Sequence, residues 1–160
     1  MKVGIISDTH DNVPHIVKAL EVFVERGCEA LIHAGDFGAP FALKALLKFP
    51  GKVYGVLGNC DGEVEGLRKL LPELKLGPLN LQLNSCRIVV IHRVRKLTDA
   101  DRAEADVVIC GHSHRARITP GKPLIINPGE CGGWLTGKCS IAILDTDSIS
   151  AELVDLGVCP

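Results

Sequence analysis

Side chains that commonly bind metal ions recur in four short motifs and at one isolated histidine. SDTH, AGD, GNCD and GHSH, together with that histidine, supply Asp8, His10, Asp36, Asn59, His92, His112 and His114. Four imidazoles with two carboxylates and one amide suit Mn, Ni, Fe, Co or Zn better than Mg or Ca. Seven ligands are too many for one ion that must also bind a substrate, so they favour two ions that share one carboxylate.

A pair of such ions would define the chemistry of the site. Two divalent ions about 3.5–4 Å apart clamp the attacking and leaving oxygens of an in-line phosphoryl transfer. Each residue alone has a simpler explanation, because a lone Asp after a strand often caps a helix and a lone His is often structural. We assign His15 and His33 to that structural class. The ordered set as a whole favours a metal centre for phosphoester chemistry.

Each motif follows a short apolar run that predicts a buried strand. These runs cover residues 2–7, 29–33, 52–57, 87–92 and 106–110. Apolar residues at helical spacing predict helices at 12–26 and 41–49, so the first part of the chain alternates strand and helix. That order indicates a parallel sheet with right-handed crossovers. Ligands bind at the carboxyl ends of the strands in such sheets, which is where the motifs should converge.

The second half of the chain is richer in strands. We expect strands at 79–84, 123–127, 139–144 and 149–156, a hairpin turn at 145–148 and a short helix at 98–105. In the first predicted helix, an apolar stripe should face the core; it consists of Ile16, Val17, Leu20, Phe23 and Val24. Because no linker separates the halves, we expect two packed sheets with helices outside, in a single domain spanning residues 1–160.

Composition narrows the class of protein. The chain has 160 residues, 46% of them hydrophobic, and a mean hydropathy of +0.23, which excludes a disordered chain. A net charge of −1 gives no strong signal for nucleic acid or membrane partners. The opening MKVGIISDTH has too short an apolar run for a signal peptide, so we expect a cytoplasmic protein. The sequence is compatible with either a monomer or an oligomer.

Cysteine usage fits the same compartment. The seven cysteines are odd in number and form no C-x-x-C pair, which argues against a disulfide framework or a zinc ribbon. We expect most of them to pack as small buried hydrophobes, with Cys159 exposed near the end.

Taken in order, SDTH, AGD, GNCD, the strand-end His92 and GHSH resemble the calcineurin-like metallophosphoesterase superfamily. The short length, GNCD in place of a GNHD-type motif, and INPGE near Asn127 resemble its small bacterial and archaeal phosphodiesterase branch. That branch is related to the retromer subunit of the same fold. The resemblance covers nearly the whole chain. It implies an α/β fold, a four-layer α/β/β/α sandwich of two mixed β-sheets flanked by helices.

The resemblance also implies roles for individual residues. One ion would be held by Asp8, His10 and His114 and a second by Asn59, His92 and His112, with Asp36 bridging the two. The ions would be divalent, with Mn²⁺ expected and Ni²⁺, Fe²⁺, Co²⁺ or Zn²⁺ as alternatives. A hydroxide bridging them would attack the phosphorus of a small phosphodiester or phosphomonoester. Asn59 would also lie near the substrate phosphate, and Asp61 would orient the loop or a metal-binding histidine.

Cys60 departs from the family pattern on the leaving-group side. Many relatives have a histidine here that protonates the leaving group, whereas Cys60 offers a thiol. A thiol with a pKa of ~8.5 is a weak donor. We therefore expect slow reaction with alkoxide leaving groups and tolerance of phenolic ones, with Cys60 as a candidate substrate contact.

A second departure follows His92, where relatives usually have glycine and this chain has Arg93. The bulk of Arg93 could shift the loop and His92. Alternatively, Arg93 or Arg95 could face the site and bind phosphate through a charge-assisted fork. The third possibility is a solvated basic loop at residues 93–96.

Two other classes of function compete with a metal-dependent phosphodiesterase. A fold of this family that has lost catalysis could serve as a scaffold or binding module, as the retromer subunit does. That subunit lacks part of the ligand set, whereas all seven positions are filled here, which favours the enzyme. A nucleotide-binding Rossmann domain is disfavoured because SDTHDN, not G-x-G-x-x-G, follows the first strand.

Overall fold

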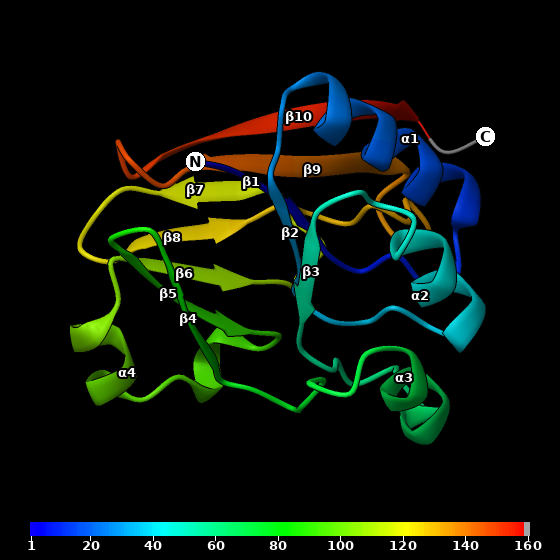
Figure 1. Cartoon of the computed structure of the whole chain (residues 1–160), viewed down its shortest axis with the longest axis horizontal. Coiled ribbons are helices and arrows are strands. Elements are labelled where there is room, and N and C mark those ends of the chain that lie inside the picture. The colour runs from blue at the N-terminus through cyan, green and yellow to red at the C-terminus, as the bar shows by residue number, and fades with distance from the viewer. Residues whose placement is uncertain (159–160) are drawn as a thin grey trace.

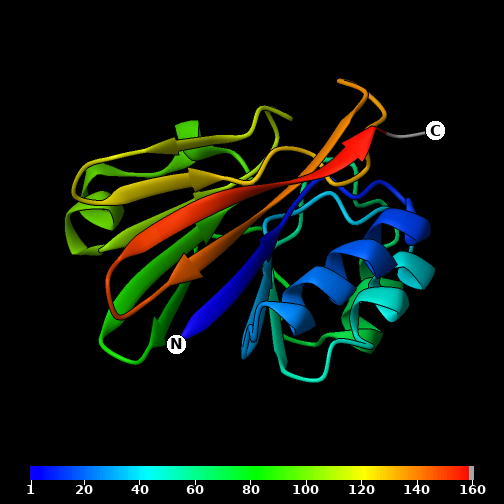
Figure 2. The same ribbon diagram turned by 90° about the horizontal axis from the view of Figure 1, so that it is seen from above.

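Two five-stranded sheets pack face to face and carry helices on their outer sides (Figures 1 and 2). The computed structural model describes residues 1–158, so Cys159 lies outside the described residues. The first sheet consists of β1 (Lys2–Ile6), β2 (Ala30–His33), β3 (Lys52–Gly55), β9 (Lys138–Asp145) and β10 (Ser150–Val158). The second consists of β4 (Leu79–Leu83), β5 (Cys86–Ile91), β6 (Val107–Cys110), β7 (Arg117–Thr119) and β8 (Leu124–Asn127).

Both sheets are mixed. In the first, β1, β2 and β3 are parallel, whereas β9 pairs antiparallel with β1 and with β10. In the second, β5, β6 and β8 are parallel, and β4 and β7 are antiparallel edge strands. Three helices, α1 (Val13–Glu25), α2 (Pro40–Leu46) and α3 (Val64–Leu70), lie on one outer side and α4 (Asp99–Glu104) on the other (Figure 1). The predicted four-layer α/β/β/α sandwich is confirmed.

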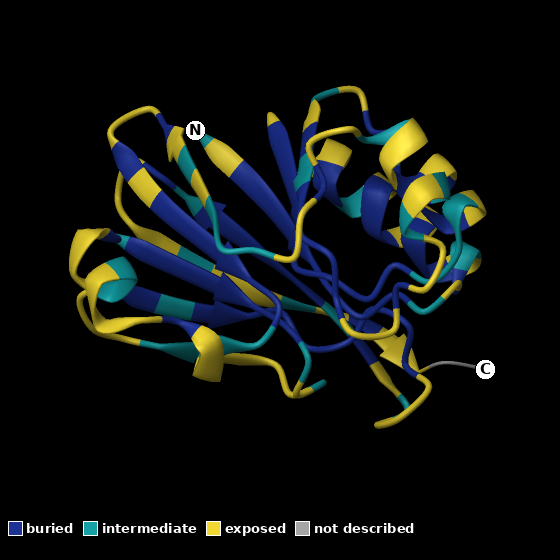
Figure 3. Cartoon of the chain, turned by 90° about the horizontal axis from the view of Figure 1, so that it is seen from below, coloured by how far each residue is buried: buried dark blue, intermediate teal, exposed yellow. Residues whose placement is uncertain are grey.

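Apolar residues fill both faces of the central strands, which explains their continuous apolar runs. In β1, Val3 and Ile5 point into the core between the sheets, and Ile6 packs toward the helices. In β5, Ile88 and Val90 face the same inter-sheet core. The central strands of both sheets are accordingly buried, while exposed residues gather on the helices, the loops and the edge strand β10 (Figure 3).

Helix α1 begins where the sequence predicts, but its buried face is narrower than expected. The Asn12 side chain accepts a hydrogen bond from the backbone N–H of His15 at 3.3 Å and so caps the first turn. Within the predicted stripe, Ile16, Leu20 and Phe23 are buried, but Val17 and Val24 are 40% and 53% exposed. Each of these valines lies one residue, or about 100°, beyond a buried neighbour and turns away from the sheet. The prediction that both valines belong to the core is wrong.

Three short elements were not predicted: α3, β7 and the 3-10 turn η1 (Val94–Lys96). Helix α3 fully buries only Leu67, so its sequence carries little apolar periodicity. Strand β7 has three residues at a sheet edge, none of them buried. The expected burial of cysteines holds for Cys28, Cys86, Cys110, Cys131 and Cys139, whereas Cys60 is exposed.

Candidate metal centre

The predicted ligands converge because the parallel strands of both sheets direct their carboxyl ends to one place. Asp8, Asp36 and Asn59 follow β1, β2 and β3 of the first sheet. His92 and His112 follow β5 and β6 of the second. Loops from two separate sheets therefore supply one cluster of polar side chains, as expected for ligand sites at strand ends.

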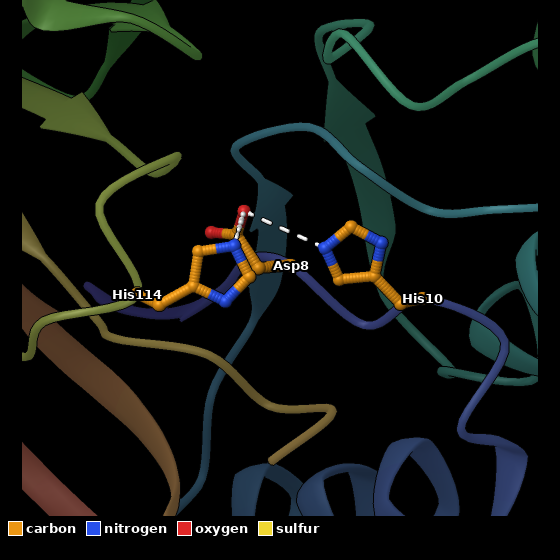
Figure 4. A group of neighbouring side chains, drawn as sticks. All are labelled: Asp8, His10 and His114. Carbon is orange, nitrogen blue, oxygen red and sulfur yellow. Dashed lines mark ion pairs between the residues drawn. The ribbon is translucent and has the colours of Figure 1, made fainter. Parts of the chain in front are cut away.

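One group of potential ligands consists of Asp8, His10 and His114 (Figure 4). Asp8 Oδ1 lies 4.0 Å from His10 Nε2 and 3.5 Å from His114 Nε2. The two imidazole rings stack with centroids 5.4 Å apart. All three residues offer ligand atoms within 4.8 Å of one another, which suits a shared divalent cation.

Asp36 lies between this group and His92, which follows β5 of the second sheet. Its Oδ2 is 3.7 Å from His10 Nε2 and 3.3 Å from His92 Nε2. Asp8, Asp36 and His92 form a second group of neighbouring ligand atoms, and all three residues are buried. A carboxylate in this position can contact ions held on either side.

The orientation of His92 leaves one ring nitrogen for a cation. Its Nδ1 contacts the carbonyl oxygen of Ala34 at 2.8 Å, so Nδ1 carries the proton and donates. Its Nε2 faces two oxygens, Asn59 Oδ1 at 3.1 Å and Asp36 Oδ2 at 3.3 Å. His112 completes the cluster, with its ring centroid 5.2 Å from that of His92. Because acceptor atoms converge here, either a proton or a metal ion is needed between them.

Backbone conformation also sets these residues apart. Among residues 1–158, the non-glycine residues with positive φ are Asp8, His10, Asp11, Asp36, Asn84, His112, His114 and Ile149. Five of these eight are predicted ligands. Left-handed φ values are costly for residues with a Cβ and concentrate at functional sites. The strain therefore supports a functional rather than a purely structural role for the loops.

Two motif glycines permit the close approach of these loops. A Cβ at Gly58 would lie 2.0 Å from Asp36 Oδ1 and 2.3 Å from its backbone nitrogen. A Cβ at Gly111 would lie 2.0 Å from Ser7 Oγ and 2.8 Å from Asp8 Oδ2. The glycines of GNCD and GHSH are thus required by the packing of one loop against the next.

Asp61 ties two of the loops together. Its buried carboxylate accepts backbone N–H bonds from Asp36 at 3.1 Å, Gly38 at 3.0 Å and Gly58 at 2.7 Å. Of the two roles that we expected for Asp61, these bonds are compatible with orientation of the loop, and no hydrogen bond joins Asp61 to a histidine within residues 1–158. The Asp61 carboxylate therefore packs against the backbone of the loop that carries Asp36.

Glu130 is a residue of the site that sequence reasoning missed. It is fully buried, and its Oε2 accepts a hydrogen bond from His114 Nδ1 at 2.9 Å. It also accepts the backbone N–H groups of Leu135 and Thr136. Glu130 thus aligns His114 with Nε2 toward Asp8, as carboxylates commonly do for metal-binding histidines. The INPGE motif was the available signal, but a lone glutamate after a strand does not reveal its partner.

Cys60 and Arg93 both lie at the rim of the cluster. Cys60 is exposed, and its Sγ lies within 4.8 Å of ligand atoms of His10 and Asp36. Its backbone N–H donates to Asp36 Oδ1 at 2.8 Å. Arg93 Nε donates to Asn59 Oδ1 at 3.2 Å, so Arg93 faces the site. This direction is compatible with phosphate binding by Arg93, which stays a prediction, whereas Arg95 and Lys96 are exposed.

The two histidines assigned to structure behave accordingly. His33 is fully buried, with Nε2 3.1 Å from Thr9 Oγ1 and Nδ1 accepting the backbone N–H of Gly35. His15 is buried in helix α1. Neither belongs to the groups of potential metal ligands among the described residues.

Comparison with known proteins places this arrangement in a family. Residues 1–149 match the calcineurin-like phosphoesterase superfamily domain. The chain belongs to this superfamily. Phosphodiesterase MJ0936 of Methanocaldococcus jannaschii is 36% identical over 156 residues, which cover 92% of this chain and 94% of that protein. Phosphodiesterase YfcE of Escherichia coli K12 is 26% identical over 169 residues, covering 94% and 90%.

Solved structures agree with the assignment to the calcineurin-like superfamily. An archaeal phosphodiesterase has a TM-score of 0.87 at 35% identity and covers 98% of this chain and 100% of its own. Vps29 of Chaetomium thermophilum, at 15% identity, has a TM-score of 0.72 over 100% of both chains and shares the fold alone. The predicted resemblance and the prediction of a metallophosphoesterase-family enzyme are confirmed, and the family implies divalent metals.

Charge in this calcineurin-like centre is distributed unevenly before any cation binds. Burial raises the pKa of the Asp8 carboxyl. Burial opposes ionisation of Asp36 too, but the His92 imidazole and the Cys60 N–H outweigh it and hold the pKa of Asp36 well below its usual range. Burial disfavours a charged His92, yet Asp36 outweighs burial and raises the pKa of His92. In His112, burial and the nearby Arg93 lower the pKa.

These directions predict that the affinity for divalent metal falls as pH falls. His92 must lose its Nε2 proton to bind an ion, and its raised pKa keeps that proton to a higher pH than the usual ~6.5. Affinity should therefore be full above the raised pKa of His92 and should decline as pH falls through it. Calorimetric titration of the metal-free protein with Mn²⁺ between about pH 5 and pH 8 measures this. Equal affinity across that range would contradict the prediction.

A second prediction concerns Glu130. Glu130→Gln removes the charge that stabilises His114, and we expect metal affinity to fall by ~10–100-fold, as is typical for residues that support a ligand. Glu152→Gln is the matched control, because Glu152 is exposed and pairs only with Arg26 at 2.9 Å among the described residues. Metal titration of both variants is the measurement. Unchanged affinity in Glu130→Gln would show that His114 needs no such partner.

Proposed function

We propose that this chain is a metal-dependent phosphodiesterase that works with two divalent ions. Asp8, His10 and His114 would hold one ion, and Asn59, His92 and His112 the other. The observation that carries the proposal is the position of Asp36, whose Oδ2 lies within 4 Å of imidazole nitrogens from both groups, at 3.7 and 3.3 Å. A carboxylate at that point can bridge two ions.

The donor set supports this assignment. Imidazole and carboxylate ligands together suit Mn²⁺, Ni²⁺, Fe²⁺, Co²⁺ or Zn²⁺, and we propose Mn²⁺ as the working ion. His92 and His114 each use Nδ1 for a hydrogen bond, to Ala34 and to Glu130, and so keep Nε2 for an ion. Bound cations would relieve the electrostatic repulsion between the acceptor atoms that face one another around Asp36.

Bound ions would supply an activated hydroxide and would neutralise charge on the phosphoryl oxygens. The residues of the chain would hold the phosphate, fix the loops and line the leaving-group side. Asn59 and Arg93, joined by a 3.2 Å hydrogen bond, lie where a phosphate oxygen would be held. Asp61 fixes the loop that carries Asp36. Cys60 stands beside Asp36 and His10 on the exposed side, where a leaving group would depart.

Restoring metal to stripped protein tests the proposal. We expect protein freed of metal to be inactive on bis-p-nitrophenyl phosphate and to regain turnover when Mn²⁺ is added. Magnesium and calcium should restore little activity, because imidazole-rich sites favour transition metals. Absence of turnover with every divalent ion tried would overturn the proposal and favour a scaffold of this fold.

The natural substrate on this proposal is a small phosphodiester or phosphomonoester. No helix in residues 1–158 is long and apolar enough to span a bilayer. We further propose that residues 1–160 act as one domain in the cytoplasm. Fractionation of the cells that make the protein would test its location.

A further inference from the structure

A basic cavity adjoins the candidate metal centre on its second-sheet side. The cavity has a volume of about 370 Å³, within the range of small-molecule sites. Its lining includes Arg93, Arg95, Lys96, His112 and Ser113. No carboxylate lines it among the described residues. It is thus a concave, positively charged surface on a chain whose net charge is only −1.

The cavity shares wall residues with a smaller cavity beside the candidate centre. A smaller cavity of about 170 Å³ is lined by Asn59 and His92 and shares Arg93 and Lys96 with the larger one. His112, a predicted ligand, lies on the wall of the larger cavity. Arg93 and Lys96 therefore stand between the phosphoester site and the basic cavity.

Among the described residues, the positive charges in the cavity form no ion pair with a carboxylate. Within residues 1–158, Arg95 and Lys96 are exposed and make no side-chain hydrogen bond or ion pair. In the same part of the chain, Arg93 uses only Nε, toward Asn59, which leaves both Nη groups as donors. Uncompensated guanidinium groups in a concave site favour a bound anion, and the planar fork of arginine matches phosphate.

A hydroxyl donor faces the same space. Ser113 Oγ accepts hydrogen bonds from Asn127 Nδ2 at 3.0 Å and from the backbone N–H of Arg115 at 3.4 Å. With both acceptor positions engaged, its own O–H is left to donate, and no protein acceptor takes it among the described residues. An anion in the cavity would provide that acceptor.

We infer that the substrate carries a second phosphate, and that this phosphate binds in the cavity formed by Arg93, Arg95, Lys96 and Ser113. The inference rests on the proposed function, since the scissile phosphoester would lie at the metal centre. It narrows the substrate class to small phosphodiesters that bear an additional phosphomonoester. A nucleic acid strand is a different ligand. Among the described residues that line the cavity, His112 carries the only aromatic ring, whereas single strands usually stack on several.

Two chromogenic substrates with the same nucleoside and the same leaving group test the inference. They are thymidine 5′-(p-nitrophenyl phosphate) and the same compound with a 3′-phosphate. With Mn²⁺, we expect kcat/KM to be at least ~10-fold higher for the 3′-phosphorylated substrate, mainly through a lower KM, which is the effect of about 1.4 kcal/mol of binding. Equal kcat/KM values would overturn the inference while leaving the proposed function intact.

A charge-removing double variant locates the effect. In R95Q/K96Q, we expect the kcat/KM ratio of the two substrates to fall toward one. The matched control, K44Q/K48Q, removes two exposed lysines from the α2 region and should keep the wild-type ratio. An unchanged ratio in R95Q/K96Q would overturn the assignment of the second phosphate to this cavity.

A binding measurement remains informative if neither substrate is hydrolysed, which would be a failure of the proposed function. Calorimetry should then show that thymidine 3′,5′-bisphosphate binds at least ~10-fold more tightly than thymidine 5′-monophosphate. Equal affinities would overturn the inference. Displacement of the bisphosphate by a thymidine decanucleotide at a lower phosphate concentration would also overturn it, in favour of a nucleic acid ligand.

Discussion

Replacing Asp36 by asparagine is expected to abolish metal-dependent turnover. Asparagine keeps the size of the side chain and an oxygen that can accept the Cys60 N–H, now bonded at 2.8 Å. It removes the negative charge that lies 3.7 Å from His10 Nε2 and 3.3 Å from His92 Nε2. Loss of a residue that supports a ligand costs ~10–100-fold, so loss of the shared carboxylate itself should lower kcat/KM by more than ~100-fold.

The effect should appear in metal content as well as in rate. We expect elemental analysis of D36N to find less than the wild-type amount of bound Mn²⁺, with an unchanged circular dichroism spectrum. D99N is the matched control, because Asp99 is exposed in the first turn of α4 and belongs to no group of potential metal ligands among the described residues. Wild-type metal content and activity in D36N would refute the bridging role.

The substitution Cys60→His should accelerate the hydrolysis of diesters with alkyl leaving groups. Burial, and next the charge of Asp36, raise the pKa of the Cys60 thiol, so the thiol is a poor proton donor at neutral pH. A positioned general acid contributes ~10²–10⁴-fold, and an imidazole at this place should supply at least the lower end of that range. Phenolic leaving groups need no proton, so the rate with bis-p-nitrophenyl phosphate should stay the same.

The pH profile distinguishes acid catalysis from a change in packing. With the alkyl substrate, we expect C60H to lose activity as pH rises above the pKa of the new imidazole, and we expect the wild-type protein to show no such decline. Cys60→Ser is the control, since it keeps a small polar side chain without an imidazole. If C60H gains no rate on the alkyl substrate, the absence of an acid at position 60 does not limit this enzyme.

The position of the candidate site could be predicted because its signals are local. Each of Asp8, Asp36 and Asn59 follows an apolar run, and parallel strands gather their carboxyl ends at one edge. The sequence also predicted two packed sheets, but the assignment of each strand to one sheet or the other could not be predicted from it. Nothing in the apolar runs specifies that β5 and β6 belong to a second sheet.

Other features depend on side-chain partners that are distant in the sequence. Glu130 resembles any acidic residue after a strand until its contact with His114 is known. The inward direction of Arg93 depends on a hydrogen bond to Asn59, which lies 34 residues earlier. Val17 and Val24 fit the helical period but lie past the edge of the packed face, because periodicity gives the direction of a face and not its width.

Crystals grown with Mn²⁺ and measured at the manganese absorption edge would test the central claim most directly. We predict two anomalous peaks about 3.5–4 Å apart, with Asp36 between them. One peak should lie among Asp8, His10 and His114, and the other near Asn59, His92 and His112. A single peak, or two peaks that share no contact with Asp36, would contradict a two-metal centre.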